Sequence, residues 1–229
     1  MKTDSTVKPG ISIIEPRPGQ ELRSWFPKIV PIYKAVFGDE IWCEGYKCSR
    51  CGRKYAFSAP SIANGFCCEV KLQEYYADGD IVRMLESLLL RRYQLRLALD
   101  SAERVVGFQW GWVDSLSGMN DKLDLFPAKL LELEASLKAQ GLFSTTMYYW
   151  AESGVINEFR RQGLATAMYA SIRQSLVRQG VRNKILRTTR SSPQYRLSTQ
   201  MGDTEVFNYM DNTLDRRTFD QRILLAGGI

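Results

Sequence analysis

The feature of this sequence that constrains its fold most is a strand that passes through a short basic turn directly into a helix. Residues 145–156 are rich in aromatic and β-branched side chains, which is typical of a strand. Residues 163–178 carry apolar side chains three and four positions apart, which predicts a helix. Arg160 and Arg161 lie in the turn between them. A fold that contains this segment must therefore place the start of a helix directly after the end of a strand.

The turn at residues 160–165 has the chemistry of an anion-binding site. The first turn of a helix has unpaired backbone N–H groups and the positive end of the helix dipole, and both stabilise a bound phosphate. Gly163 has no Cβ, so a pyrophosphate can approach the backbone closely, and Ala165 keeps the next turn slim. The alternative is an ordinary strand–helix junction in which Gly163 only eases packing.

Turn residues and apolar periodicity predict the elements before this segment. Pro27 and Pro31 should kink or divide the first helix, and Asp80 can cap the second. In the predicted strand at 104–113, bulky side chains alternate with Gly107, Gln109 and Gly111. This alternation predicts one buried face and, at the glycines, room for a ligand. The predicted elements are strands at 11–14, 95–99 and 104–113 and helices at 20–37 and 81–92.

The remaining elements complete a mixed domain. Pro127 suits the first position of a helix at 128–140, and Gly141 suits its end. The composition of residues 116–124 predicts a polar turn. The other predicted elements are a strand at 184–189, a short helix from Ser192 or Pro193 to Gly202, and strands at 206–210 and 218–225. This order indicates an α+β fold: one domain over 1–229 with a largely antiparallel central sheet, flanking helices and a helical insertion at 116–141.

Composition excludes several classes of site and partner. The chain has no histidine, so Ser–His or Cys–His catalysis and His-ligated metal sites are excluded. A formal net charge of +6 suits an anionic partner such as a polyphosphate cofactor, and it permits nucleic-acid binding without favouring it. The sequence has no apolar run of the roughly 20 residues that span a bilayer, and residues 1–10 lack the apolar centre of a secretory signal. We therefore expect a cytoplasmic protein without a membrane partner.

The segment at 155–165 resembles the pyrophosphate loop of the GNAT superfamily of N-acyltransferases. The family pattern is Arg/Gln-x-x-Gly-x-Gly/Ala, which Arg160, Gly163 and Ala165 match. The preceding Val155 also fits the family's approach to the loop, although Asn157 stands where proline is common. The resemblance covers roughly residues 95–225, and it implies a central sheet splayed in the middle for acyl-CoA.

The resemblance implies acetyl-CoA or another acyl-CoA as co-substrate and direct attack by a neutral amine. Backbone groups of 155–157 would pair with the pantetheine arm, and the amides after Arg160 would hold the pyrophosphate. The implied cofactor-binding residues are Val155, Ile156, Asn157, Arg160, Arg161, Gln162, Gly163, Leu164 and Ala165.

Direct attack requires a base for the amine and a proton for the departing thiolate. Glu152 is the candidate base because it precedes the turn in an aromatic stretch that could raise its pKa; the alternatives are a solvated or salt-bridged glutamate, or deprotonation through water. In much of the family a tyrosine lies about four residues before a glycine in the helix after the fifth strand. Counting back from Gly202 gives Ser198, which departs from that pattern. Tyr195, one helical turn earlier, is the first candidate for proton donor, and Ser198 is the alternative.

Five cysteines lie within residues 43–68, and none occurs elsewhere. An odd, clustered set favours metal or redox chemistry over a disulfide framework, and the Cys-x-x-Cys-Gly segment that begins at Cys48 suits tetrahedral zinc. The second pair is adjacent, so both members can bind one ion only if the backbone makes an unusual turn. We predict structural zinc in a zinc-ribbon-like module at 41–70, with its four ligands drawn from Cys43, Cys48, Cys51, Cys67 and Cys68. Redox-active or buried thiols are the alternative.

The sequence therefore predicts an acyl-CoA-dependent N-acyltransferase that acts on a small-molecule or protein amine. One rival hypothesis is a zinc-ribbon module that binds nucleic acid and only senses coenzyme A. Another is an enzyme that modifies aminoacylated RNA. The sequence does not identify the acceptor or the oligomeric state.

Overall fold

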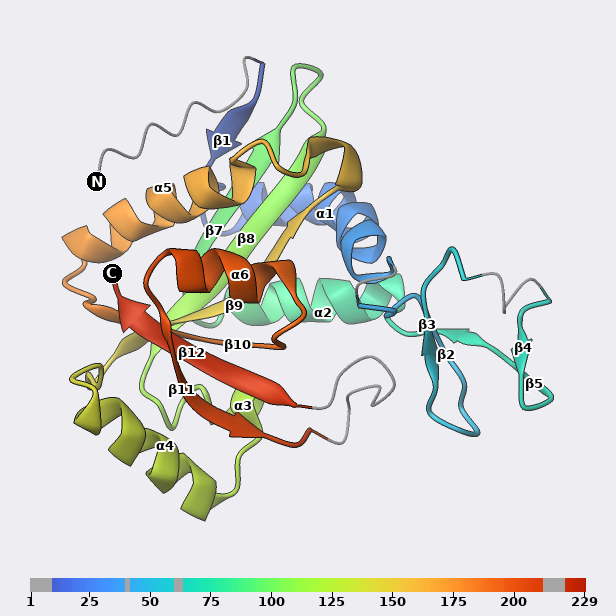
Figure 1. Ribbon diagram of the computed structural model, residues 1–229. Helices are drawn as coiled ribbons and strands as arrows, with labels where there is room; N and C mark the ends of the chain where they lie inside the picture. Colours follow the sequence, from blue (N-terminus) through green and yellow to red (C-terminus); the bar gives the residue numbers. More distant parts are fainter. Residues whose placement is uncertain (1–9, 40–41, 60–63, 212–220) are drawn as a thin grey trace. The chain divides into compact units, whose positions relative to one another are not determined.

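The computed structural model describes residues 10–39, 42–59, 64–211 and 221–229 (Figure 1). Its largest sheet contains β1 (Ser12–Ile14), β7 (Arg92–Leu99), β8 (Val105–Asp114), β9 (Met147–Val155), β10 (Asn183–Thr188), β11 (Thr204–Tyr209) and β12 (Arg222–Gly228). The strand order is β1-β7-β8-β9-β10-β12-β11. β9 and β10 pair in parallel, whereas β1 with β7, β10 with β12, and β11 with β12 pair antiparallel. The predicted mixed α+β fold with a mostly antiparallel sheet is confirmed.

The helices are α1 (Gln20–Phe37), α2 (Asp78–Leu88), α3 (Asn120–Leu123), α4 (Pro127–Ala139), α5 (Leu164–Arg178) and α6 (Pro193–Gln200), with a 3-10 turn, η2, at Asn157–Phe159.

Contacts divide the chain into two compact units. The first comprises Met1–Leu90, Arg96–Phe108 and Gly154–Ala167, and the second comprises Arg91–Leu95, Gln109–Ser153 and Met168–Ile229. No helix in the described ranges has the length and apolar character that crossing a membrane requires.

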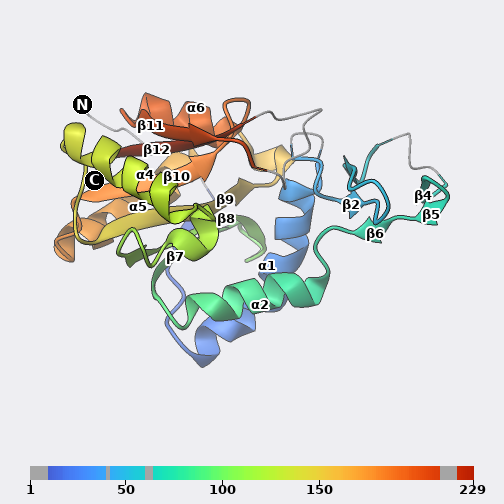
Figure 2. The same ribbon diagram turned by 90° about the horizontal axis from the view of Figure 1, so that it is seen from below.

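In the first unit, α1 and α2 pack side by side (Figure 2). The buried face of α1 includes Tyr33, whose ring stacks on that of Phe108 with centroids 5.8 Å apart. α1 is one helix through Pro27 and Pro31, so of the two predicted effects, a kink or a division, the division is wrong. Both prolines are exposed, so water can satisfy the carbonyl groups that lose their helical partners.

The cysteine-rich module also belongs to the first unit. Its strands β2 (Tyr46–Lys47), β3 (Lys54–Tyr55) and β6 (Gln73–Glu74) form a sheet in the order β3-β2-β6. β4 (Phe66–Cys67) and β5 (Val70–Lys71) form a separate hairpin. The predicted first residue of the module, Ile41, lies outside the described residues. β6 extends the module beyond its predicted end at Val70, because Gln73 and Glu74 pair with Lys47 and Tyr46.

The core of the second unit lies between α5 and the neighbouring strands β9, β10 and β12. The rings of Trp150 and Tyr169 stack within it, with centroids 4.8 Å apart and an interplanar angle of 6°. α4 packs against β11 and α6 against β12. The buried members of this core are Val113, Tyr148, Trp150, Tyr169, Ile172, Leu176, Val181, Leu186, Ile223 and Leu225.

The structure of β8 contradicts the prediction that this strand has one buried and one solvated face. All of its residues from Val105 to Val113 are buried, and Gln109 is 0% exposed, so the strand has no solvated face. The alternation of large and small side chains reflects packing in the middle of the sheet rather than one wet face. A Cβ on Gly111 would lie 2.7 Å from the Tyr148 hydroxyl, so tyrosine fills the space in which a ligand was expected.

Two element boundaries also differ from the prediction. α2 begins at Asp78 and β7 begins at Arg92, so the predicted helix at 81–92 ends too late. Asp80 is the third residue of α2 rather than its cap, and its carboxylate accepts the Ala77 N–H at 3.0 Å. β12 continues to Gly228, past the predicted end at residue 225, because the last residues pair with β10; residues 218–220 of that predicted strand lie outside the described residues. The apolar residues at 88–90 fit a helix as well as a strand, so their spacing alone does not fix the boundary between α2 and β7. The pairing of β7 in the sheet decides it.

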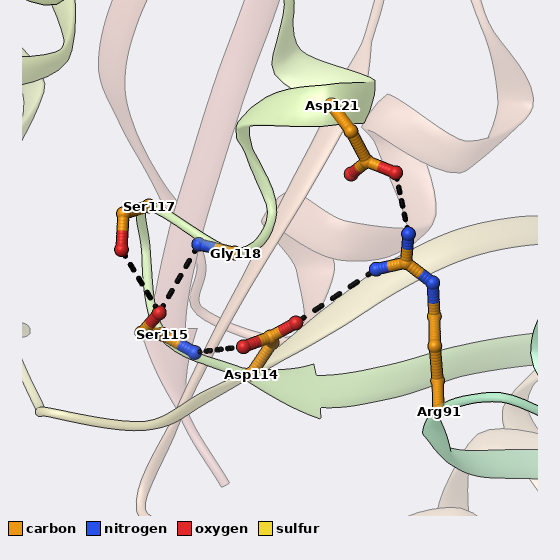
Figure 3. A network of polar contacts seen from close by, with 6 residues as sticks. All are labelled: Arg91, Asp114, Ser115, Ser117, Gly118 and Asp121. Atoms are coloured by element: carbon orange, nitrogen blue, oxygen red, sulfur yellow. Dashed lines mark hydrogen bonds and ion pairs between the residues drawn. The ribbon is translucent and has the colours of Figure 1, made fainter.

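The turn after β8 is fixed by a polar network (Figure 3). Arg91 pairs with Asp121 and lies 3.8 Å from Asp114. Asp114 accepts the Ser115 N–H at 2.7 Å, and the Ser115 hydroxyl accepts the Gly118 N–H at 3.1 Å. The predicted polar turn therefore contains ordered structure, including the single turn of α3.

Candidate active site and cysteine cluster

The strand–turn–helix segment predicted from the sequence is present as β9, η2 and α5. Between η2 and α5 the backbone takes positive φ at Arg161 (60°) and at Gly163 (76°), on either side of Gln162. Such alternation turns successive N–H groups toward one side, and such concave backbones bind anions. The Gly163 carbonyl accepts the first bond of α5, from the Ala167 N–H at 2.9 Å, so the N–H groups before Ala167 have no acceptor within the helix.

The space in front of this turn is open. No heavy atom of the described chain lies within 4 Å of the place that a Cβ on Gly163 would occupy. Gly163 and Arg161 are exposed, whereas Leu164 is buried and anchors the first turn of α5. The geometry thus offers backbone donors to an anion while the apolar side of the helix stays packed.

The Arg160 side chain fixes the turn instead of facing its open side. Its Nε donates to the Val155 carbonyl at 2.9 Å, and its Nη2 donates to the Asp39 carboxylate at 2.6 Å. Asp39 immediately follows Gly38 at the end of α1, so the turn is tied to that helix. Sequence reasoning named Arg160 as a phosphate-binding residue and missed Asp39, for which no local signal exists.

Several backbone groups at 155–157 already have partners. The Val155 carbonyl accepts from Arg160, and the Ile156 N–H donates to the Val106 carbonyl at 3.1 Å. The Ile156 carbonyl accepts the Phe159 N–H at 3.0 Å. These three backbone groups are therefore already satisfied within the described chain.

Glu152 is a half-buried residue of β9 beyond the part of the strand that pairs with β10. That pairing joins Tyr148, Tyr149 and Trp150 to Lys184, Ile185 and Leu186. Burial raises the pKa of Tyr149 to about 12; the positive charge of Arg187 opposes this, and the negative charge of Glu152 adds to it. The Glu152 carboxylate therefore lies within electrostatic reach of a buried phenol.

Tyr195 of α6 and Arg190, which precedes that helix, both bind Glu205 of β11. Ser192 caps α6 by accepting the Tyr195 N–H at 3.0 Å. The Tyr195 hydroxyl donates to Glu205 at 2.5 Å, and Glu205 also binds Arg190 at 2.7 and 3.0 Å. The hydrogen bond to Glu205 raises the pKa of Tyr195, while Arg190, and then Tyr195, lower the pKa of Glu205. The phenol is therefore protonated at neutral pH.

Ser198 has different surroundings. It is 0% exposed, and its hydroxyl donates to Asp203. Asp203 lies 3.0 Å from the ammonium of Lys184, with both side chains 1% exposed. Burial lowers the pKa of Lys184, and the charge of Asp203 opposes that shift. The two proton-donor candidates on α6 thus differ: Tyr195 is half-buried, whereas Ser198 is enclosed with a buried ion pair.

The described part of the chain brings four of the five cysteines together. The sulfur atoms of Cys48, Cys51, Cys67 and Cys68 all lie within 4.8 Å of one another. Cys43 is not in this group; its backbone N–H donates to the Asp39 carbonyl at 2.8 Å. The four sulfurs form a compact cluster that can surround one ion.

The cluster contains thiols of very different acidity. The Arg53 backbone N–H donates to Cys51 and, more than any other contact, lowers the pKa of that thiol to about 7. Hydrogen bonds with Cys67 and Cys51 raise the pKa of Cys68 to about 12. Cys51 is therefore much more acidic than Cys68.

Comparison with known proteins gives a result at the level of the fold. No family model matches this sequence. No curated protein matches it either. Solved structures do match: the polyamine N-acetyltransferase of Drosophila melanogaster has a TM-score of 0.60 at 11% identity, over 95% of this chain and 100% of that one.

Two further solved structures have the same fold as this chain. Arabidopsis thaliana NAA60 in complex with acetyl-CoA has a TM-score of 0.55 at 13% identity, over 96% of this chain and 98% of that one. An acetyltransferase described as GNAT-family, from Desulfovibrio desulfuricans, has a TM-score of 0.51 at 10% identity, over 95% and 98% of the two chains. The chain has the fold of the GNAT acetyltransferases. The GNAT fold predicted from the turn at 160–165 is therefore confirmed.

Proposed function

We propose that this chain is an N-acyltransferase that binds acetyl-CoA, or a related acyl-CoA, and transfers the acyl group to a primary amine. The observation that carries the proposal is the open start of α5, where Arg161 and Gly163 alternate in φ around exposed backbone donors. It occurs in a fold that is shared with a protein crystallised with acetyl-CoA.

In this proposal the backbone of the turn binds the cofactor. The N–H groups from Arg161 to Ala165 hold the pyrophosphate, supported by the dipole of α5. Arg160 acts indirectly, because its guanidinium is bound to Val155 and Asp39 and keeps the turn in shape. The pantetheine arm pairs with backbone groups of residues 155–157 other than the Val155, Ile156 and Asn157 carbonyls and the Ile156 N–H, which have partners within the described chain.

The transfer step is a direct attack within a ternary complex. The amine nitrogen bonds to the thioester carbonyl carbon, the C–S bond breaks, and coenzyme A leaves as a thiol after it takes up a proton. We assign Glu152, directly or through water, as the base that accepts the amine proton, and Tyr195 as the proton donor. Ser198 is the weaker candidate, because its hydroxyl is buried and donates to Asp203.

The acceptor is assigned by class only: a primary amine of a small molecule or of a protein. The name of the Drosophila neighbour indicates a polyamine acceptor for that enzyme, which is consistent with this class. Zinc at the cysteine cluster takes no part in the step, because a site closed by four thiolates has no open coordination position.

Acetyl-CoA binding and turnover test the proposal separately. Isothermal titration should show one acetyl-CoA per chain, and a concentration of 100 times the Kd should stabilise the fold by about 2.7 kcal/mol. A panel of amines, followed by release of free coenzyme A thiol, should then identify an acceptor. Absence of stabilisation at saturating acetyl-CoA contradicts the whole proposal. Tight binding with no amine-dependent thiol release contradicts transfer and indicates a coenzyme A sensor.

A further inference from the structure

The cysteine cluster joins two small sheets that share no strand pairing. Cys48 and Cys51 lie in the turn between β2 and β3, and Cys67 and Cys68 lie at the turn of the β4–β5 hairpin. Pairing places β2 and β3 in one sheet and β4 and β5 in another. The sulfur cluster therefore links the turn of the β4–β5 hairpin to the β2–β3 turn.

The sulfur positions match the tetrahedron around zinc. Zinc–sulfur bonds of about 2.3 Å in tetrahedral geometry place the sulfurs roughly 3.8 Å apart. The observed separations are 3.7 Å between Cys51 and Cys67 and 3.6 Å between Cys67 and Cys68. All four sulfurs lie within 4.8 Å of one another. The four side chains thus already have nearly the spacing that the ion requires.

The backbone explains how two adjacent cysteines can bind the same ion. In an extended strand their side chains would point to opposite faces. Cys68 and Glu69 instead take left-handed conformations, with φ of 51° and 66°. Non-glycine residues rarely adopt such angles, because Cβ crowds the backbone there. The pair of left-handed residues turns the Cys68 sulfur back toward that of Cys67.

Neighbouring groups complete the surroundings of the cluster. The Tyr55 hydroxyl donates to the Cys67 sulfur at 3.0 Å, and the Arg53 backbone N–H donates to Cys51. Arg50 donates to the Cys68 carbonyl at 3.2 Å. Donors of this kind orient thiolate ligands and disperse their negative charge, as outer-shell groups do in metal sites.

We propose that Cys48, Cys51, Cys67 and Cys68 bind one zinc ion, that Cys43 does not, and that the ion fastens the β4–β5 hairpin to the β2–β3 turn. The proposal goes beyond acyl transfer, because the ion is structural and neither binds nor activates the substrate. Cys43 is excluded by its absence from the sulfur cluster. A module with few buried apolar residues gains from the ion the cross-link that its strand pairing lacks.

Metal analysis of the full-length protein, purified under reducing conditions, tests the assignment. We expect one zinc per chain in the wild type and in Cys43→Ser, and less than about a tenth of that in Cys51→Ser and Cys68→Ser. Cys43→Ser is the matched control, because it removes a thiol from the same module. Equal zinc loss in Cys43→Ser and Cys68→Ser would overturn the ligand set. A metal-free wild type with four reduced thiols, or with a disulfide among them, would overturn the site.

Two measurements on the wild type keep the proposal testable if a variant does not fold. Cobalt exchanged into the site should give the absorption bands of tetrahedral four-thiolate coordination; an octahedral spectrum would contradict it. Chelation should increase amide hydrogen exchange in the hairpin at residues 64–72 while exchange in β10 and β12 stays unchanged. Unchanged exchange in the hairpin after the zinc is removed would contradict the fastening role.

Discussion

The Arg160 guanidinium lies 2.6 Å from the Asp39 carboxylate, which is 121 residues earlier in the chain. Both side chains are about one quarter exposed, at 27% and 25%. The same guanidinium donates to the Val155 carbonyl, so one side chain closes the turn on itself and ties it to the end of α1. The Arg160 side chain therefore positions the turn, and in the proposed site the backbone N–H groups contact the phosphate.

Asp39→Asn should weaken acetyl-CoA binding without abolishing it. The amide cannot form the ion pair, so the turn loses one restraint while its backbone donors stay in place. A charged contact about one quarter exposed contributes about 1 kcal/mol, which corresponds to a roughly threefold to tenfold higher Kd. Isothermal titration measures this change. Arg17→Lys, which affects the exposed pair with Glu21, is the control and should leave the Kd unchanged. An unchanged Kd in Asp39→Asn would show that the turn keeps its shape without α1.

Gly163→Ala should lower acetyl-CoA affinity far more than it lowers stability. At φ of 76° an alanine costs about 1 kcal/mol, and its Cβ would stand in the open space where we place the pyrophosphate. We expect at least a tenfold increase in Kd, together with a loss of stability of about 1 kcal/mol in urea denaturation.

Gly180→Ala provides the matched comparison. Gly180 has φ of 72° and also has no heavy atom within 4 Å of a built Cβ. The backbone strain is therefore the same, but the residue follows the C-terminal end of α5. It should lose similar stability and keep the wild-type Kd. If both variants bind acetyl-CoA equally well, the pyrophosphate site is not at Gly163.

Local patterns predicted much of this fold because they act over a few residues. The spacing of apolar residues in α5, the start of α6 at Ser192 or Pro193 and Pro127 at the start of α4 are all short-range signals, and the structure contains each of these features. Boundaries failed where one pattern fits two elements, as at the junction of α2 and β7. The prediction that Pro27 and Pro31 divide α1 failed for another reason. The effect of a proline on a helix depends on whether the face that carries it is exposed to solvent.

The candidate site was predictable only where its residues are neighbours in sequence. The turn at 160–165 and the Cys-x-x-Cys pair are local, so their chemistry is readable. Asp39, Glu205 and Asp203 act through contacts that form only in the folded chain. The adjacent cysteines show the same limit, because the left-handed backbone at Cys68 that lets them converge leaves no mark in the residue types.

Tyr195→Phe should lower kcat by roughly a hundredfold and leave KM nearly unchanged, if Tyr195 donates the proton. The pKa of Tyr195 is raised above its ordinary value of 10.0 by Glu205. The acid form is therefore present at neutral pH and is lost only as pH rises above about 10. Steady-state kinetics from pH 7 to 10 measure both effects. Wild-type kcat that already falls between pH 7 and 9 would contradict a donor with this raised pKa.

Ser198→Ala separates the two candidates on α6. It removes the hydroxyl that donates to Asp203, so a buried carboxylate loses one donor. We expect a stability loss of about 1–3 kcal/mol with kcat within about twofold of the wild type. A large fall in kcat with unchanged stability would assign the proton donor to Ser198 instead.

Asp203→Ala should destabilise the fold by roughly 3–5 kcal/mol, because it leaves the Lys184 ammonium buried without its partner.

The sign of the pH dependence of this loss follows from burial, which lowers the pKa of Lys184 below 10.5. Between the folded pKa and 10.5 the unfolded chain binds the extra proton, so stability rises with pH in that window. Removal of Asp203 takes away the charge that opposes this shift, so the stability loss in Asp203→Ala should decrease as the pH rises from 7 toward 10.5 in urea denaturation. The double variant with Lys184→Met should recover part of it, and Glu132→Gln, in an exposed pair with Lys129, should change stability by less than about 0.5 kcal/mol. If Asp203→Ala is as stable as Glu132→Gln, the buried ion pair does not hold the turn between α6 and β11 to β10.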